Sequence, residues 1–211
     1  MPRLARTRFG AVYCSDLARC TETLQIATSA ASELHDLASP LPAPQYLPLL
    51  RERGAGVFEG TPLGTVDAAA AAAGMTTKAF RPEGGESWGD VRARAVSFLS
   101  LLASHIPRTR AECETVLAVT HGGFIRGACA AAATRTHPLT HSAAAVISAA
   151  AERSPPGAPS VANSGQRAGN TAVYTFELQR TPSGSWHCAL VAANDTTHLA
   201  NLEAASEHAT E

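Results

Sequence analysis

Short apolar runs alternate along the chain with longer stretches of helical composition. The runs FGAVYCS at 9–15 and TVLAVT at 115–120 are each bounded by polar or turn-forming residues, which predicts buried strands. Stretches with helical spacing of apolar residues follow directly, over 16–37 and 122–134. Strands that alternate with helices predict an α/β fold, a three-layer α/β/α sandwich around a mostly parallel central sheet.

The clearest helical pattern lies over 88–106. Ser87 and Asp90 resemble a capping box at its start. A shorter, alanine-rich helix is predicted over 63–73, with Gly74 just past its end. The apolar positions of the longer helix form a single stripe, which we expect to face the core: Val91, Ala95, Phe98, Leu99 and Leu102.

Segments rich in proline, glycine and serine separate these elements. Prolines predict an extended connection over 38–50, and glycine-rich loops are expected at 51–60 and 81–90. Residues 137–151 have helical composition, and the following 154–169 predicts a flexible loop.

Two further stretches alternate apolar and polar residues near the C-terminus. Residues 170–178 and 186–194 flank a TPSG turn, which predicts a β-hairpin. The 211 residues fit one domain of ordinary size, so we expect a single domain over 1–211.

Composition excludes several classes of protein. Hydrophobic residues make up 45% and charged residues 17% of the chain, which is typical of a globular protein. The formal net charge of −1, without a concentrated basic face, argues against a nucleic-acid partner, and no apolar run predicts a membrane span. Five cysteines without a C-x-x-C pair favour a reducing compartment, for which we expect the cytoplasm. The sequence indicates no oligomeric state.

Three strand-end loops carry ionisable side chains: Arg19 after the first strand, Glu52 in the run LRERGAG, and His121 in THGG. In α/β folds such loops meet at the carboxyl edge of the sheet. Singly, each residue has a plainer interpretation, as an exposed arginine, a solvated charge run or a hydrogen-bonded structural histidine. Together they describe a pocket for phosphate, because arginine binds phosphate oxygens in pairs, histidine donates to them and a carboxyl can protonate a leaving alcohol.

Four motifs in this order resemble the histidine phosphatase (phosphoglycerate mutase-like) superfamily. They are VYCSDLARCTETLQIA, LRERGAGVFEG, PEGGES and VTHGGFIRG, and the resemblance runs from about residue 9 to the C-terminal hairpin. The finer details, including PEGGESWGDVRARAVSFL and a long insert before GNTAVYTFEL, look most like the TIGAR-type fructose-2,6-bisphosphatases.

The resemblance implies a role for each candidate residue. Arg19 would hold the transferred phosphoryl group, and Glu52 would be the general acid and then the base. His121 would donate to the phosphoryl oxygens as charge builds in the transition state. The remaining substrate-binding candidates are a backbone donor at Gly122 and the side chains of Arg53, Glu86 and Ser87. No cofactor or metal is implied, and the expected partner is a small phosphorylated substrate.

The nucleophile of the family is a further histidine, in an Arg-His-Gly motif on a strand that precedes SDLxR. No Arg-His-Gly triplet occurs in the 211 residues, and the first histidine is His35. We therefore expect a domain that is truncated at its N-terminus and lacks the first, central strand of the sheet. Covalent phosphoryl transfer needs that nucleophile. Two hypotheses follow: a phosphatase whose nucleophile lies outside this chain, or an inactive anion-binding or regulatory relative.

Two other motifs are set aside. Cys129 and Arg135 have the cysteine–five residues–arginine spacing of tyrosine phosphatases, but the alanines between them predict a helix, whose N–H groups are already bonded. His137 and His141 could share a helix face, yet no carboxylate stands at a spacing suited to a metal site.

Overall fold

The computed structural model describes residues 7–33, 40–62, 64–105, 115–133, 172–180 and 186–197. The predicted helix at 137–151, the predicted loop at 154–169, and His137 and His141 lie outside these residues.

The parallel sheet contains three strands in the order β2-β1-β3. The central strand β1 (Ala11–Cys14) pairs in parallel with β2 (Gln45–Tyr46) and with β3 (Val116–Val119). The strands at β1 and β3 confirm the two apolar runs. Strand β2 was not predicted, because two exposed residues within a proline-rich stretch show no alternation.

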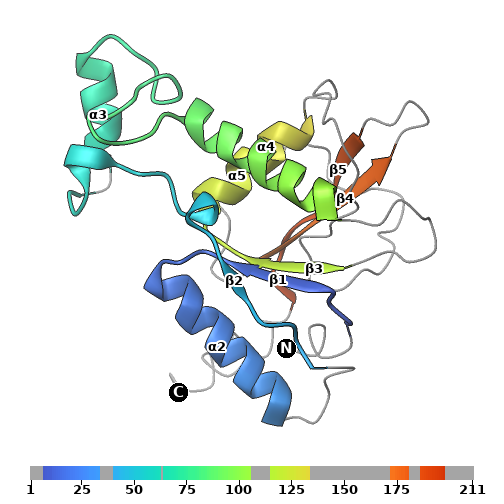
Figure 1. Cartoon of the computed structure of the whole chain (residues 1–211). Coiled ribbons are helices and arrows are strands. Elements are labelled where there is room, and N and C mark those ends of the chain that lie inside the picture. Colours follow the sequence, from blue (N-terminus) through green and yellow to red (C-terminus); the bar gives the residue numbers. More distant parts are fainter. Residues whose placement is uncertain are drawn as a thin grey trace, which may run out of the picture.

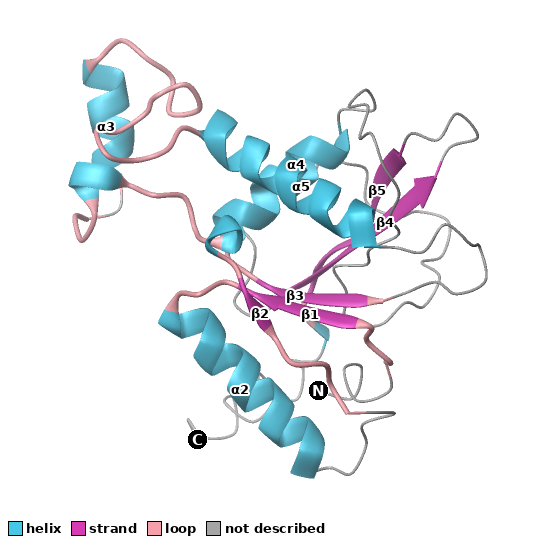
Figure 2. Cartoon of the chain, in the orientation of Figure 1, coloured by secondary structure: helices cyan, strands magenta, loops and turns pink. Residues whose placement is uncertain are grey.

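Helices cover both faces of this sheet, which confirms the three-layer α/β/α arrangement (Figures 1 and 2). Helix α2 (Ala18–Glu33) lies on one face, and α4 (Trp88–His105) and α5 (Gly122–Ala133) lie on the other. Successive strand residues point to opposite faces. Accordingly, Tyr13 joins the cluster under α4 and α5, while Val12 joins the cluster under α2.

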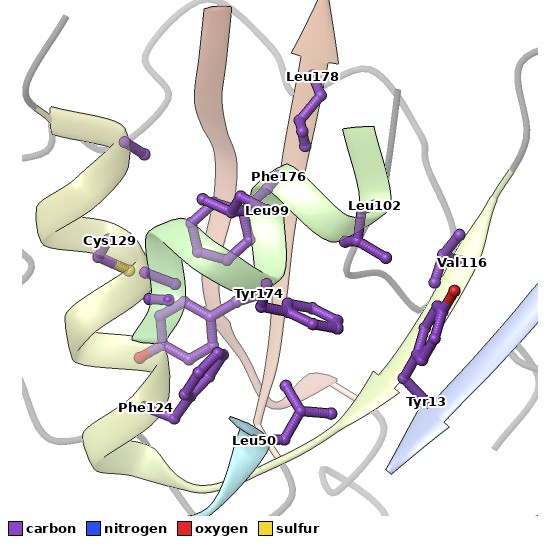
Figure 3. Close-up of a cluster of buried hydrophobic side chains, with 14 of the residues drawn as sticks. Tyr13, Leu50, Leu99, Leu102, Val116, Phe124, Cys129, Tyr174, Phe176 and Leu178 are labelled. Atoms are coloured by element: carbon purple, nitrogen blue, oxygen red, sulfur yellow. The ribbon is translucent and has the colours of Figure 1, made fainter. Parts of the chain in front are cut away.

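The predicted hairpin is present but forms a sheet of its own. Strands β4 (Val173–Arg180) and β5 (Trp186–Asp195) pair antiparallel, and they are not hydrogen-bonded into the parallel sheet. The expected single sheet is therefore divided, although both parts share one core. Figure 3 shows side chains of β4 meeting those of the parallel sheet, α4 and α5 in this core; those of β4 are Tyr174, Phe176 and Leu178.

Aromatic rings connect the parallel sheet to the two helices above it. Phe98 of α4 meets Tyr13 at 5.6 Å and Phe124 of α5 at 5.9 Å between ring centroids, both edge to face. This arrangement is the favourable one for aromatic pairs. All five residues of the predicted apolar stripe on α4 are buried, which confirms that this face points to the core.

The shorter elements also follow the sequence. Helix α3 (Thr65–Ala72) ends before Gly74, whose φ of +68° suits a residue without a side chain. Two short 3-10 helices, η1 (Pro48–Leu50) and η2 (Gly56–Phe58), flank the loop that carries Glu52. No helix in the described part of the chain is long and apolar enough to cross a membrane.

Candidate active site

Three loops converge at the carboxyl ends of β1 and β3. The N–H of Ser15, just after β1, donates to the carbonyl of Val119 at the end of β3 (2.8 Å). The hydroxyl of Thr120 donates to the carbonyl of Leu50 (2.7 Å), which attaches the loop after η1 to the same place. These bonds bring Arg19, Glu52 and His121 from distant parts of the sequence to one edge of the sheet.

The ring of His121 is buried, with 6% of its surface exposed, and both of its nitrogens are engaged. Arg19 donates from Nε to Nδ1 of His121 (3.0 Å). Because an arginine has no acceptor, Nδ1 must be the unprotonated nitrogen. The proton therefore lies on Nε2, which donates to Oγ of Ser15 at 2.8 Å.

This arrangement keeps His121 neutral. Burial, and then the positive charge of Arg19, lower its pKa from 6.5 to about 4, although the carboxylate of Glu52 acts in the opposite direction. A ring that already carries a proton on Nε2 cannot accept the hydroxyl proton of Ser15. The serine–histidine pair is therefore a donor–acceptor contact and not an activated nucleophile.

In the guanidinium of Arg19, one nitrogen is held by the described part of the protein and the two terminal nitrogens are not. Its Nε is held by His121, while the residue as a whole is exposed on the first turn of α2. Among the residues that the structure describes, its terminal nitrogens have no hydrogen-bond partner and no carboxylate neutralises it. These nitrogens can take an anion through two parallel hydrogen bonds.

Glu52 is half-buried, and its carboxylate is held by backbone groups. Oε1 accepts from the N–H of Arg53 (2.9 Å), and Oε2 accepts from the N–H of Gly123 (3.1 Å) in the first turn of α5. A side chain at position 123 would overlap Oε1 of Glu52. The second glycine of THGG thus makes room for a carboxylate of the protein.

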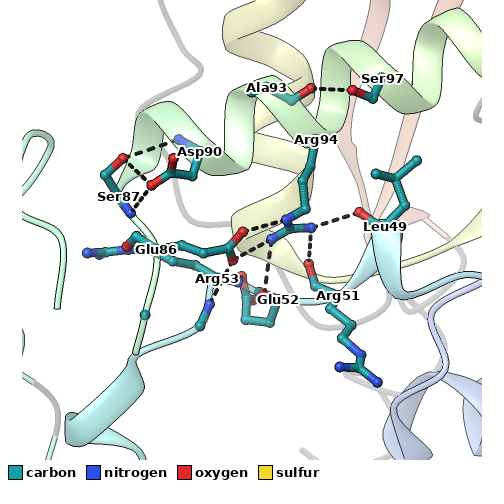
Figure 4. Close-up of polar contacts among 12 residues, drawn as sticks. Leu49, Arg51, Glu52, Arg53, Glu86, Ser87, Asp90, Ala93, Arg94 and Ser97 are labelled. Atoms are coloured by element: carbon teal, nitrogen blue, oxygen red, sulfur yellow. Dashed lines mark hydrogen bonds and ion pairs between the residues drawn. The ribbon is translucent and has the colours of Figure 1, made fainter. Parts of the chain in front are cut away.

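Glu86 forms an ion pair with Arg94 of α4 (Figure 4). Nε and Nη2 of Arg94 donate to its two oxygens at 2.7 and 2.8 Å, and the N–H of Gly54 donates to Oε2 at 3.0 Å. Burial opposes ionisation of Glu86, but these bonds outweigh it, and the pKa of the carboxyl is lowered. The carboxylate of Glu86 is therefore directed at the protein's own loop.

The other candidates also have partners within the protein. Arg53 donates to the carbonyls of Glu86 (2.7 Å) and Phe80 (3.2 Å). Ser87 forms the predicted capping box: its N–H and hydroxyl donate to Asp90 at 2.8 and 2.7 Å, and the N–H of Asp90 donates back at 3.2 Å.

Gly122 is exposed and begins α5. Its N–H belongs to the first turn and has no acceptor within the helix. The backbone N–H of Gly122 is thus left available for a ligand.

Several contributing residues were not predicted from the sequence. Ser15 and Arg94 hold the main candidates, and Asp16 binds Arg51 through two bonds of 2.7 and 2.6 Å. Those bonds lower the pKa of Asp16. For Ser15 and Asp16, the one signal in the sequence was their position beside Arg19 in the SDLAR motif.

The structure also bears on the cysteine of the first motif set aside, whereas His137 and His141 of the second lie outside the described residues. Cys129 lies within α5 with 2% of its surface exposed, and burial raises the pKa of its thiol to about 11. A thiol in this state is not a nucleophile at neutral pH. Within the described ranges, no three side chains of His, Cys, Asp or Glu form a group that could hold a metal ion.

Comparison with solved structures supports the fold. A mycobacterial glucosyl-3-phosphoglycerate phosphatase superposes with a TM-score of 0.60 at 22% identity, over 92% of this chain and 80% of that one. A phosphoglycerate mutase from Bacillus anthracis also gives a TM-score of 0.60, at 19% identity, over 94% of this chain and 78% of that one. At these identities the likeness concerns the fold alone.

Relatives with curated functions match at modest identity. The fructose-2,6-bisphosphatase TIGAR of Mus musculus is 32% identical over 114 residues, which cover 54% of this chain and 40% of that protein. The fructose-2,6-bisphosphatase TIGAR B of Danio rerio is 37% identical over 94 residues, 44% of this chain and 35% of that protein. The chain thus spans less than half the length of these relatives.

A family model matches a larger part of the chain. Residues 1–154 match the model described as histidine phosphatase superfamily, branch 1. This range includes β1, the loop with Glu52, α4, β3 and α5, and so contains every candidate site residue. The chain belongs to the histidine phosphatase superfamily.

Proposed function

We propose that this chain forms the phosphate-binding and acid–base part of a phosphatase that hydrolyses a small phosphorylated metabolite, with fructose-2,6-bisphosphate as the candidate substrate. The observation that carries the proposal is the meeting of Arg19, Glu52 and His121 at one edge of the sheet. An exposed guanidinium, a neutral imidazole and a carboxylate are the groups that phosphoryl transfer needs around its reacting phosphorus.

In the proposed reaction, Arg19 binds two phosphoryl oxygens through its terminal nitrogens. The Nε2–H of His121, which donates to Ser15 in the structure, is turned to a third oxygen. A histidine of an Arg-His-Gly segment outside these 211 residues attacks phosphorus, and the phosphorus–oxygen ester bond breaks. The protonated carboxyl of Glu52 gives its proton to the departing alcohol. Glu52 then takes a proton from water, which attacks phosphorus, breaks the phosphorus–nitrogen bond and releases phosphate.

The division of the sheet supports a place for such a segment. Strands β3 and β4 contribute Val116 and Phe176 to the same buried cluster, yet they belong to separate sheets. Strand β3 ends the order of its sheet, and β4 pairs with β5 alone among the described strands, so each has a side on which an additional strand could pair. The proposal puts the strand with the nucleophile there.

The alternative proposal is an anion-binding or regulatory protein without turnover. It is favoured by one observation, the lack of an Arg-His-Gly triplet in a chain that keeps Arg19, Glu52 and His121. The two proposals agree on phosphate binding and differ on catalysis.

Four free cysteines among the described residues support a reducing compartment for either protein, and we retain the cytoplasm as the proposed location.

The test separates binding from turnover. Inorganic phosphate is titrated into the 211-residue chain and followed by NMR, and Arg19→Ala should weaken its binding by about 10-fold or more. Phosphate release and acid-labile phosphohistidine are then measured with fructose-2,6-bisphosphate and simple sugar phosphates. The same assays are run on a form extended upstream to any Arg-His-Gly in the gene.

Each outcome decides between the proposals. Turnover in the extended form, reduced about 100-fold or more by Glu52→Gln, supports the phosphatase. Binding without turnover in either form supports the anion-binding alternative. Binding of phosphate that is unaffected by Arg19→Ala contradicts both.

A further inference from the structure

Arg94 uses all of its hydrogen-bonding capacity on one loop and its partner. A guanidinium has five N–H donors. In addition to the two bonds to Glu86, Nη1 donates to two backbone carbonyls and Nη2 to a third, at 2.7, 2.9 and 3.3 Å respectively (Figure 4); these belong to Leu49, Arg51 and Glu52. The five contacts match the five donors.

The ion pair reaches both sides of Glu52. Arg94 binds carbonyls at and before this residue, and Glu86 binds the N–H of Gly54 two positions after it. The carbonyl of Gly54 in turn accepts from the N–H of Glu86 at 2.9 Å. The backbone from 49 to 54 is therefore fixed by residues that lie elsewhere in the sequence.

The position of the Glu52 carboxylate depends on that backbone. Its two hydrogen bonds come from backbone N–H groups, those of Arg53 and Gly123, and no side chain of the described residues holds it. A shift of the loop would therefore change the distance from Oε2 to the N–H of Gly123.

We propose that Arg94, with Glu86 as its partner, is the positioning residue for the carboxylate of Glu52. The inference rests on the proposed function, which makes Glu52 the acid–base group. Arg94 hydrogen-bonds to Glu86 and to loop carbonyls, and not to the carboxylate of Glu52, so it acts through the loop. Arginine is required because lysine has three donors on one nitrogen and cannot reach five acceptors spread over the fork.

A second arginine of the same region provides a matched control. Arg81 pairs with Asp90 at 3.5 Å, with side chains 65% and 34% exposed, whereas those of Arg94 and Glu86 are 19% and 24% exposed. Arg81→Lys thus makes the same chemical change in an ion pair that does not touch the Glu52 loop.

The experiment is an NMR pH titration of the full 211-residue chain. The amide proton of Gly123 should shift as Glu52 ionises, because the two groups are hydrogen-bonded, and Glu52→Gln identifies that response by removing it. The amide of Thr197, which donates to Asp195 at 3.0 Å, serves as an internal reference far from the loop in sequence. Neither readout requires turnover.

With Arg94→Lys, we expect the amplitude of the Gly123 response to fall to about half or less, because hydrogen bonds weaken steeply with distance and misalignment. The Thr197 response should be unchanged, and Arg81→Lys should leave both unchanged. A folded Arg94→Lys protein with a wild-type response at Gly123 would overturn the proposal. If Arg94→Lys does not fold, Glu86→Gln is judged by the same criterion, since it keeps an acceptor oxygen but loses the charge.

This inference and the proposed function can fail separately. A loss of the Gly123 response in Arg94→Lys stands as support for positioning even where no phosphate is released. Conversely, turnover that depends on Glu52, together with an unchanged Gly123 response in Arg94→Lys, contradicts the positioning role alone.

Discussion

The N–H of Gly123 donates to Oε2 of Glu52 across 3.1 Å, although 71 positions separate the two residues. The contact joins the first turn of α5 to the loop after η1. It also orients the carboxylate beside His121, whose pKa responds to the charge of Glu52. The acid–base candidate is therefore placed by a backbone group of the same segment that carries the histidine.

Gly123→Ala should displace this carboxylate, because the added Cβ would overlap Oε1 and lie 2.9 Å from Cδ of Glu52. In an active, extended form we expect turnover to fall about 100-fold, comparable to losing an acid–base group, while phosphate binding is retained. Gly89→Ala is the control, since its Cβ would meet only Oγ of Ser87 at 3.4 Å. Normal turnover in Gly123→Ala would argue against an acid–base role for the carboxylate in its observed position.

The neutral state of His121 should make stability depend on pH. Its folded pKa of about 4 lies below its ordinary value of 6.5, so the unfolded chain takes up the proton first as the pH falls. The stabilisation is fully present above pH 6.5 and is lost toward pH 4, by up to about 3 kcal/mol. Urea unfolding at several pH values measures this slope.

The control for that prediction is His121→Gln, which should flatten the slope between about pH 6.5 and 5. The carboxyls with lowered pKa also contribute to stability, but they lose that contribution only below their ordinary values, such as 4.5 for Glu86. They therefore do not mask the slope between about pH 6.5 and 5. An equal slope in the wild type and the variant would show that His121 is not the group responsible.

Alanine substitutions at two nearby glycines can distinguish the cost of backbone strain from the cost of steric overlap. Gly56 and Gly60 both have positive φ, +59° and +75°. A Cβ at Gly60 would meet nothing within 4 Å, whereas one at Gly56 would overlap the carbonyl of Glu83 and lie 2.6 Å from the N–H of Gly85. We expect Gly60→Ala to cost about 1 kcal/mol and Gly56→Ala about 3 kcal/mol or more in the free energy of unfolding. Equal losses in denaturant unfolding would contradict the close packing of these loops.

Cys129 should be dispensable for phosphate chemistry. Its thiol is buried in α5 and has a pKa of about 11, so Cys129→Ala should leave phosphate binding, and turnover in an active form, within about two-fold of the wild type. In the folded protein, iodoacetamide at neutral pH should modify Cys129 slowly, and unfolding should expose it, as mass spectrometry can show. Loss of phosphate binding in a folded Cys129→Ala protein would support the hypothesis that Cys129 belongs to a tyrosine-phosphatase-like site.

Most of the fold could be predicted because its signals are local. The stripe on α4, the capping box of Ser87 and the alternation in the hairpin each reside within a few residues. The two-residue strand β2 could not be predicted, since its pairing with β1 leaves no pattern in the sequence. The division into two sheets was not predicted either. The alternation of apolar and polar residues within a strand does not indicate which distant strand it pairs with.

The same distinction between local and long-range signals applies to the site. Arg19, Glu52 and His121 could be named because each follows a recognisable strand or motif. Arg94 could not, since on a helix face it resembles an ordinary solvated charge, and its three backbone acceptors lie more than 40 positions away. Likewise, the pKa of His121 depends on burial and on Arg19, which only the folded chain brings 3.0 Å from the ring.

The contacts of Arg94 have a consequence for how this protein can change over evolutionary time. Its three loop acceptors are backbone carbonyls, which every amino acid carries. Mutations of the side chains at 49 and 51 therefore leave these anchors in place, provided that the backbone angles are kept. The backbone shape of this loop therefore depends little on the identity of the side chains at 49 and 51, and substitutions there can accumulate without moving Glu52.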